Sequence, residues 1–186
     1  MIITVPNKIL TTPAKPVGKI DKKIKQIIQQ MKDDLINKKN PTGVCLAATQ
    51  IGISLRLFIT KPTQTSPVDV FINPQITWSS TDLAEIERPS DTKPTLRKDR
   101  KLEGCLSIPD VWGYLKRPSK VKLKYTDIKG QPQEKEFSGF IATIIQHETD
   151  HINGILFTQR VLEQEQKFYR IEEDDNGEEE LVEIQL

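Results

Sequence analysis

The sequence lacks the features that mark secreted and membrane-spanning chains. Only two of its 186 residues are cysteine. That is too few for a disulfide framework, so we expect Cys45 and Cys105 to be free thiols in a reducing compartment. No apolar run approaches the roughly 20 residues that cross a membrane, and the opening residues MIITVPNKIL are too short and interrupted for a signal peptide. These absences predict a cytoplasmic protein with no membrane partner.

An excess of charge of either sign is also absent. The chain carries 27 lysines and arginines against 26 aspartates and glutamates. Net charge therefore gives no reason to expect a nucleic acid or an anionic surface as a partner. The length suits one domain with a core of its own. An apolar content of 36% is low for such a domain, which indicates that some segments are solvated.

Hydrophobic periodicity predicts two helices and several strands. Apolar residues three and four apart predict an amphipathic helix over 20–38, with Asp21 or a nearby polar residue as its N-cap. A second helix, apolar over a wide arc, is predicted to begin after an N-cap at Ser138 and to end at Asn153-Gly154. Alternating or apolar runs predict strands at 55–60, 70–78, 120–127 and 134–138. The last two strands are predicted to form a hairpin around the turn IKGQ.

Two segments fall outside this regular pattern. Residues 79–101 are polar, contain two prolines and predict a long exposed loop. The end of the chain is either a solvated acidic tail or a hairpin that turns at Asp-Asn-Gly, and the hairpin is favoured because apolar and polar residues alternate around the turn. We therefore divide the chain into a domain over 1–165, with an insertion at 79–101, and an acidic C-terminal hairpin or tail over 166–186.

The two histidines of the chain fall in one motif, QHETDH at 146–151. Residues four apart stack on one face of a helix, so His147 and His151 can bind the same metal ion. Glu148 lies about 100 degrees round the helix from His147, where it can act as a general base toward a water on the metal. Two chance surface histidines would not have such apolar flanks. The motif therefore predicts a metal-dependent hydrolase.

A third ligand must come from elsewhere in the chain. The downstream glutamates of 163–183 lie in charge-rich, solvated sequence. Upstream, the stretch LEGCLSIPD contains Cys105, and the adjacent Gly104 permits a close approach of the backbone. A thiolate is a strong ligand for divalent iron, nickel or zinc. We favour Cys105, because two histidines and one cysteine leave a fourth position open for a water whose pKa falls to about 7.

Three stretches together resemble the signature motifs of the peptide deformylases: GVCLAATQ at 43–50, EGCLS at 103–107 and QHETDH at 146–151. Weaker similarity extends over about residues 1–160. The resemblance implies an α+β fold, with antiparallel β-sheets packed around a central metal-binding helix. It also implies removal of the formyl group from N-formylmethionine of newly made polypeptides, with release of formate. Nascent peptides would be the substrates, and transient association with the ribosome would follow.

The resemblance also implies a role for each matching residue. One divalent ion, Fe²⁺ in vivo with Zn²⁺ or Ni²⁺ possible in a purified sample, would be bound by Cys105, His147 and His151. Glu148 would take a proton from the attacking water and pass it to the leaving amine. The Gln50 side chain and the backbone amide of Leu106 would stabilise the developing oxyanion. The substrate peptide would be bound by Gly43, Val44, Cys45, Phe140, Thr143 and Ile144.

The chain departs from the family pattern at Cys45, where the first signature has its second glycine. A side chain there could narrow the cleft, and we expect a tolerated cleft residue rather than a metal ligand. Two other functions stay open. A metalloprotease would use a downstream glutamate instead of Cys105. A structural metal site would close its coordination with a fourth protein ligand, for which Cys45 is the one plausible donor.

Overall fold

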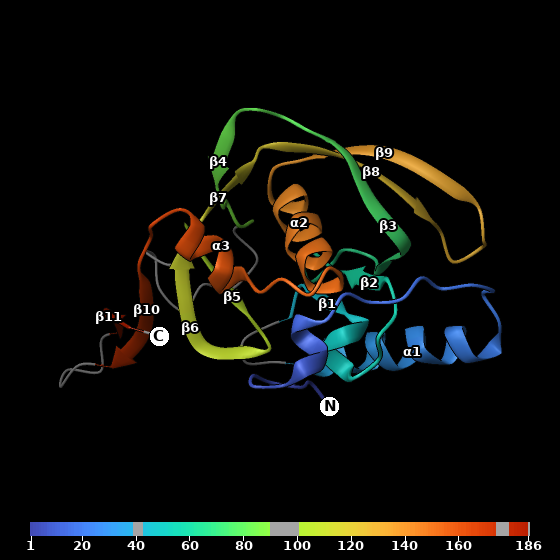
Figure 1. Ribbon diagram of the computed structural model, residues 1–186, viewed down its shortest axis with the longest axis horizontal. Coiled ribbons are helices and arrows are strands. Elements are labelled where there is room, and N and C mark those ends of the chain that lie inside the picture. Colours follow the sequence, from blue (N-terminus) through green and yellow to red (C-terminus); the bar gives the residue numbers. More distant parts are fainter. Residues whose placement is uncertain (39–42, 90–100, 174–178, 186) are drawn as a thin grey trace.

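The computed structural model describes residues 1–38, 43–89, 101–173 and 179–185 (Figure 1). None of the described helices is both long and apolar enough to cross a membrane. The elements run in the order η1 (Lys8–Thr11), α1 (Lys22–Asn37), β1 (Cys45–Ala47), η2 (Ala48–Ile51), β2 (Leu57–Thr60), β3 (Asp69–Ser79), β4 (Leu83–Glu85), β5 (Leu102–Cys105), β6 (Ile108–Tyr114), β7 (Lys116–Pro118), β8 (Lys120–Thr126), β9 (Pro132–Ser138), α2 (Phe140–Ile152), α3 (Phe157–Glu163), β10 (Phe168–Glu173) and β11 (Glu179–Ile184).

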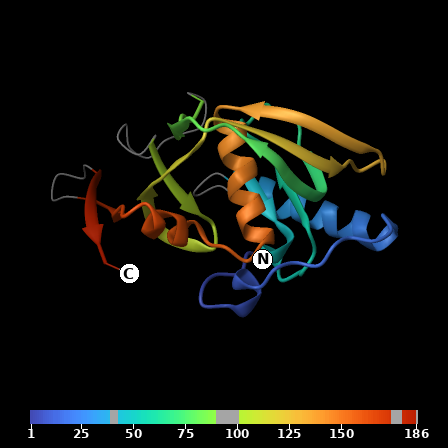
Figure 2. The ribbon, with the colours of Figure 1, turned by 45° about the horizontal axis from the view of Figure 1, so that its top comes forward.

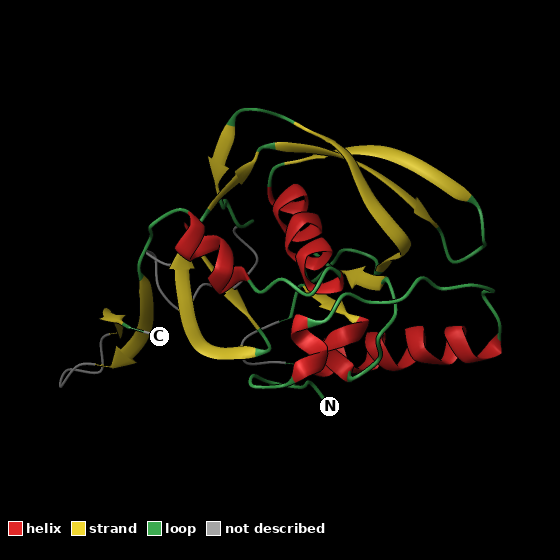
Figure 3. Ribbon diagram, viewed as in Figure 1, coloured by secondary structure: helices red, strands yellow, loops and turns green. Residues whose placement is uncertain are grey.

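The described strands form two larger sheets and one small pair, all with antiparallel neighbours. One sheet has the order β1-β2-β3-β8-β9, the second has the order β11-β10-β6-β5, and β4 pairs with β7. Figures 1 and 2 show α2 between the two larger sheets, with β3, β8 and β9 curving over it. The colouring by secondary structure in Figure 3 shows how few helices accompany these strands. The predicted α+β class with antiparallel sheets is confirmed.

Alternation along the strands places α1 and α2 on opposite faces of the five-stranded sheet. Leu57 and Ile59 pack with the apolar stripe of α1, whereas Phe58 between them packs with Ala142 and Ile145 of α2. All five side chains are fully buried. Successive strand residues point to opposite faces, and burying each large apolar side chain contributes about 1.5–3 kcal/mol. The sheet therefore holds α2 from one side while α1 closes the other.

The first helix and the central hairpin agree with the sequence-based predictions. Helix α1 begins after Asp21, whose side chain accepts a hydrogen bond from the backbone N–H of Ile24 at 3.0 Å. Strands β8 and β9 pair in register from Lys120 opposite Ser138 to Thr126 opposite Pro132. The strands predicted at 55–60 and 70–78 correspond to β2 and β3, within two residues at each end.

The predicted N-cap of the second helix is wrong. Ser138 is the last residue of β9, where it pairs with Lys120, so its backbone continues the strand. The N-cap of α2 is Gly139, which makes no side-chain hydrogen bond and has φ 65° and ψ −146°. That conformation is almost restricted to glycine, and it turns the chain directly from a strand into a helix. The predicted end at Asn153-Gly154 is confirmed, with Gly154 at φ 74°.

The predicted long loop over 79–101 is wrong for part of the segment. Residues 90–100 lie outside the described part of the chain. Before them, β4 pairs with β7 through three residues, and Ile86 is buried against Phe140 and Ile144 of α2. Polar composition concealed this strand because its residues are themselves exposed and only the following isoleucine enters the core.

The C-terminal strands agree with the favoured hairpin. β10 and β11 pair through six residues, and their connection, 174–178, lies outside the described residues. Phe168 and Tyr169 of β10 also pair with Gly113 and Trp112 of β6. The hairpin is therefore an extension of the second sheet.

The turn at Gly139 provides a test of this account. A Cβ atom at Gly139 or at Gly18 would meet no other atom within 4 Å, but only Gly139 has a positive φ. We expect Gly139→Ala to lower the free energy of unfolding by about 1–3 kcal/mol. Gly18→Ala should leave it unchanged or raise it by up to about 1 kcal/mol. Urea denaturation measures both changes, and equal effects of the two variants would contradict the assigned strain.

Candidate metal centre

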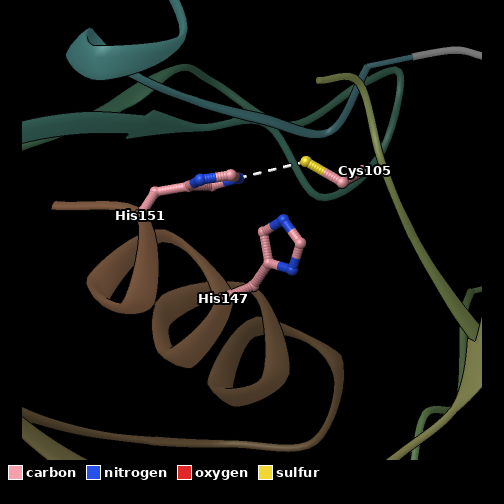
Figure 4. A group of neighbouring side chains, drawn as sticks. All are labelled: Cys105, His147 and His151. Atoms are coloured by element: carbon pink, nitrogen blue, oxygen red, sulfur yellow. Dashed lines mark hydrogen bonds between the residues drawn. The ribbon is translucent and has the colours of Figure 1, made fainter. Parts of the chain in front are cut away.

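Three predicted ligand side chains converge on one point inside the molecule. The ligand atoms of Cys105, His147 and His151 all lie within 4.8 Å of one another. Figure 4 shows the two imidazoles rising from successive turns of α2 toward the sulfur at the end of β5, with His151 Nε2 at 3.1 Å from Cys105 Sγ. Donors bound to one zinc ion at about 2.0–2.3 Å lie about 3–4.5 Å apart. The three groups therefore need only small movements to close around an ion.

The electrostatics of the cluster favour a thiolate. Burial by itself would raise the pKa of Cys105, but the charges and hydrogen bonds of His151 and His147 outweigh it and lower this pKa to about 5. Burial would likewise lower the pKa of His147, yet the neighbouring Glu103 carboxylate and Cys105 raise it. The thiolate is the form of cysteine that binds metals, so the Cys105 sulfur is in the form that a metal ion would require.

The Glu148 carboxylate is buried beside the three side chains in a way that fits a bound metal ion. Its side chain is fully buried, and neither carboxylate oxygen accepts a hydrogen bond from any described residue. Its Oε1 atom lies 4.0 Å from His147 Nε2. Burial raises the pKa of Glu148, and a buried carboxylate without a partner is costly. A cation and its water beside these oxygens would satisfy them, so the donor set and its neighbour fit a metal.

Cys45 lies close to Glu148 but outside the converging ligands. The group of potential ligands found among the described residues holds Cys105 and the two histidines only. Burial and then the charge of Glu148 raise the pKa of Cys45, although the thiol does not reach hydrogen-bonding geometry with the carboxylate. Cys45 is therefore a neutral thiol beside the site. It is a free thiol, as is Cys105, which confirms the expectation for both cysteines.

Gln50 directs its side-chain amide toward the cluster. Its Oε1 atom accepts a hydrogen bond from the backbone N–H of Ala47 at 2.8 Å. That bond fixes the amide, so that Nε2 donates toward Cys105 Sγ at 3.5 Å and Ser107 Oγ at 3.2 Å. Leu106 follows Cys105 directly, and its side chain packs with the α1 core. The two predicted oxyanion donors thus belong to segments that meet at the sulfur.

An apolar cluster lies beside Glu148. The structure brings four predicted substrate-binding residues into it: Val44, Cys45, Phe140 and Ile144. Thr143 is half-buried one turn before His147, and Gly43 is buried with Leu35 and Leu106 near the position of a Cβ. Sequence analysis missed Ile86, which completes the cluster. No signal in the polar segment around Ile86 could have identified it.

A buried network of charges, also missed from the sequence, orients His147. Nδ1 of His147 lies 2.6 Å from Glu103 Oε1, and Arg117 donates to both oxygens of Glu103 at 2.8 Å. Arg117 also donates to Asp150 at 2.9 Å, and Asp150 accepts from Arg160 of α3 at 2.8 Å. Burial would raise the pKa of Glu103, but Arg117 and His147 together lower it. Glu103 is thus an acceptor, which places the proton of His147 on Nδ1 and leaves Nε2 for a metal.

Removal of the Glu103 charge should destabilise the fold. Breaking one partner of a buried ion pair costs about 3–5 kcal/mol, and we expect Glu103→Gln to lower the free energy of unfolding by that amount at pH 7. Because the folded-state pKa of Glu103 lies below its unfolded value of about 4.3, this difference from the parent should narrow as the pH falls below 4.3.

The measurement is urea denaturation of chelator-treated protein between pH 3 and 7. The control is Glu85→Gln, because Glu85 is exposed and pairs with Lys101 at the surface; its substitution should leave stability nearly unchanged. A gap between parent and Glu103→Gln that is constant with pH would contradict the assigned charge.

Comparison with known proteins gives one consistent result. The family model for polypeptide deformylase matches residues 1–167. A peptide deformylase of Synechocystis is 35% identical over 83% of this chain and 75% of that protein, and one of Mesorhizobium japonicum is 36% identical over 86% and 82%. The crystal structure of a peptide deformylase from Thermotoga maritima matches with a TM-score of 0.73 at 31% identity, over 87% of this chain and 96% of that one. This chain belongs to the peptide deformylase family.

Proposed function

We propose that this protein removes the formyl group from N-formylmethionine of newly made polypeptides and releases formate. One observation carries the proposal, namely the convergence of one thiolate and two imidazoles beside a buried, unpartnered Glu148. Membership of the family supports the same reaction. The substrates are N-formylmethionyl nascent peptides, which implies transient association with the ribosome and a cytoplasmic location.

We propose one divalent metal ion at Cys105, His147 and His151. A set of one soft sulfur and two nitrogens suits divalent iron, nickel or zinc; we take Fe²⁺ as the ion in vivo and Zn²⁺ or Ni²⁺ as substitutes in a purified sample. When bound, such an ion polarises a carbonyl and lowers the pKa of water to about 7. Three protein ligands leave a fourth coordination position open for water or substrate, which this chemistry requires.

The protein groups around that position have complementary tasks. Glu148 accepts a proton from the attacking water and passes it to the amine that leaves, a role that its buried, unpaired carboxylate supports. The Gln50 amide and the backbone N–H of Leu106 donate to the formyl oxygen as negative charge develops on it. Each donor aimed at that charge is worth about 10²–10³ in rate.

The substrate is held by the apolar cluster and by the edge of the first sheet. Phe140 and Ile144, together with Val44 and Cys45, line the site for the methionine side chain, with Gly43 and Thr143 at its margin. Strand β1 pairs only with β2 in the described sheet, so its other edge is available to an extended peptide. We further propose that residues 1–165 form the catalytic unit and that 166–186 are an appended acidic hairpin.

Removal of the general base should separate metal binding from chemistry. We expect Glu148→Ala to retain a stoichiometric metal content and to lose about 10²–10⁴-fold or more in kcat. The assay is formate release from formyl-Met-Ala-Ser under anaerobic conditions with ferrous iron, with metal content measured on the same samples. Turnover near the parent rate would show that Glu148 is not the base.

Exchange of each cysteine should distinguish the third ligand from its neighbour. We expect Cys105→Ser to lose both metal and activity, because a neutral hydroxyl replaces a thiolate ligand. Cys45→Ser should keep a stoichiometric metal content. A metalloprotease with a downstream glutamate ligand would instead retain metal in Cys105→Ser. A closed structural site would lose metal in both variants.

A further inference from the structure

Two backbone hydrogen bonds attach the start of the chain to the active site. The N–H of Ile3 donates to the carbonyl of Gln50 at 2.8 Å, and the N–H of Val5 donates to the carbonyl of Ser107 at 3.0 Å. We call residues 3–5 the N-terminal strap. Its two acceptors belong to the segments that carry the proposed oxyanion donors, since Ser107 directly follows Leu106.

The strap connects parts of the fold that strand pairing leaves separate. Gln50 lies in η2, directly after β1 of the five-stranded sheet, whereas Ser107 lies between β5 and β6 of the other sheet. No strand of the first sheet pairs with a strand of the second within the described ranges. Besides the strap, the direct hydrogen bonds between η2 and residues 105–107 come from the Gln50 amide itself. The bond from Ala47 fixes the Gln50 amide within its own segment, but the position of that segment relative to residues 105–107 depends on these few contacts.

The Ile3 side chain adds a second contact on the same element. Gly52 ends η2 with φ 82°, and a Cβ atom at Gly52 would lie only 3.0 Å from Ile3 Cδ1. The backbone of Ile3 thus holds Gln50 while its side chain covers the residue that ends the helix. Val5 holds the opposite segment two residues later. Residues 3–5 therefore contact both segments.

We propose that Ile3 and Val5 are positioning residues, which fix the separation between the Gln50 amide and the Leu106 backbone N–H. The proposal rests on the function proposed above. Oxyanion donors act only when both lie about 2.7–3.1 Å from the charged oxygen. A displacement of about 1 Å far from the chemistry can cost about 10²-fold in rate. A strap that tethers both segments therefore contributes to kcat more than to substrate binding.

The test compares two proline substitutions one residue apart. Ile3→Pro removes the N–H that donates to Gln50. Thr4→Pro is the matched control, because Thr4 is exposed and its N–H makes no hydrogen bond to any residue that the structure describes. We expect Ile3→Pro to lower kcat for formyl-Met-Ala-Ser by about 10–100-fold relative to Thr4→Pro, with KM within about threefold and the same metal content. Equal kcat values for the two variants overturn the proposal.

A double-mutant cycle separates positioning from a general loss of stability. In a Gln50→Ala background the separation of the two donors no longer matters, so Ile3→Pro should lower kcat by less than about threefold. A full, multiplicative loss in that background overturns the proposal. If Ile3→Pro does not fold, Ile3→Ala takes its place in the same cycle, and we expect it to lower kcat by about 3–10-fold. An unchanged kcat in Ile3→Ala would also overturn the proposal.

The parent protein distinguishes failure of this proposal from failure of the proposed function. If the parent releases no formate, the assigned reaction is wrong. If the parent is active and the strap variants match their control, only the role of the strap is wrong. Amide hydrogen exchange of the parent gives a further check, in which Ile3 and Val5 should be protected relative to Thr4. Equal exchange at all three positions would mean that the strap is not closed in solution.

Discussion

The hydrogen bond between His147 Nδ1 and Glu103, 2.6 Å long, is the constraint on which the active site depends. An imidazole has two nitrogens, and only a fixed proton on one of them leaves the other available to a metal. Glu103 fixes that proton because Arg117 holds both of its oxygens. Asp150 then balances Arg117 and extends the network to Arg160 of α3. One chain of alternating charges thus connects His147, a proposed metal ligand of α2, to three other elements of the fold, β5, β7 and α3.

The architecture explains how such a network can stay dry. Helix α2 is packed by the five-stranded sheet through Phe58, Ala142 and Ile145, and the second sheet brings Glu103 and Cys105 to its other side. The second half of the helix, from Gln146 to His151, therefore presents polar and ionisable side chains, all of them buried. Burial of charge is costly unless each charge has a partner. His147 and Asp150 have charged partners, whereas neither oxygen of the Glu148 carboxylate has a hydrogen-bond partner, and this carboxylate is the group proposed for the reaction.

Helices, turns and motifs that are set by neighbouring residues could be predicted from the sequence. Contacts between residues far apart in the chain could not. The helix around His147, its end at Asn153-Gly154 and the hairpin of β8 and β9 follow from local periodicity and turn residues. Cys105 could be predicted as the third ligand because the downstream glutamates lie in solvated sequence and because EGCLS resembles a signature motif of the peptide deformylases. Arg117 could not, since nothing near it in the chain indicates that it meets Glu103 and Asp150. Ile86 was hidden in a polar segment, and Ser138 was assigned a cap that only tertiary pairing of β9 excludes.

The pKa values of the two thiols near the site are shifted in opposite directions, so their reactivity can report whether a metal ion is bound. Cys105, partly accessible, has a pKa of about 5, whereas the pKa of Cys45 is raised. The thiolate, and not the neutral thiol, is the nucleophile that attacks an alkylating reagent. Iodoacetamide should therefore label ligand-free protein once, at the sulfur that a metal would otherwise shield. Counting labelled molecules by mass spectrometry would then give the fraction of a preparation that carries no ion, without any substrate.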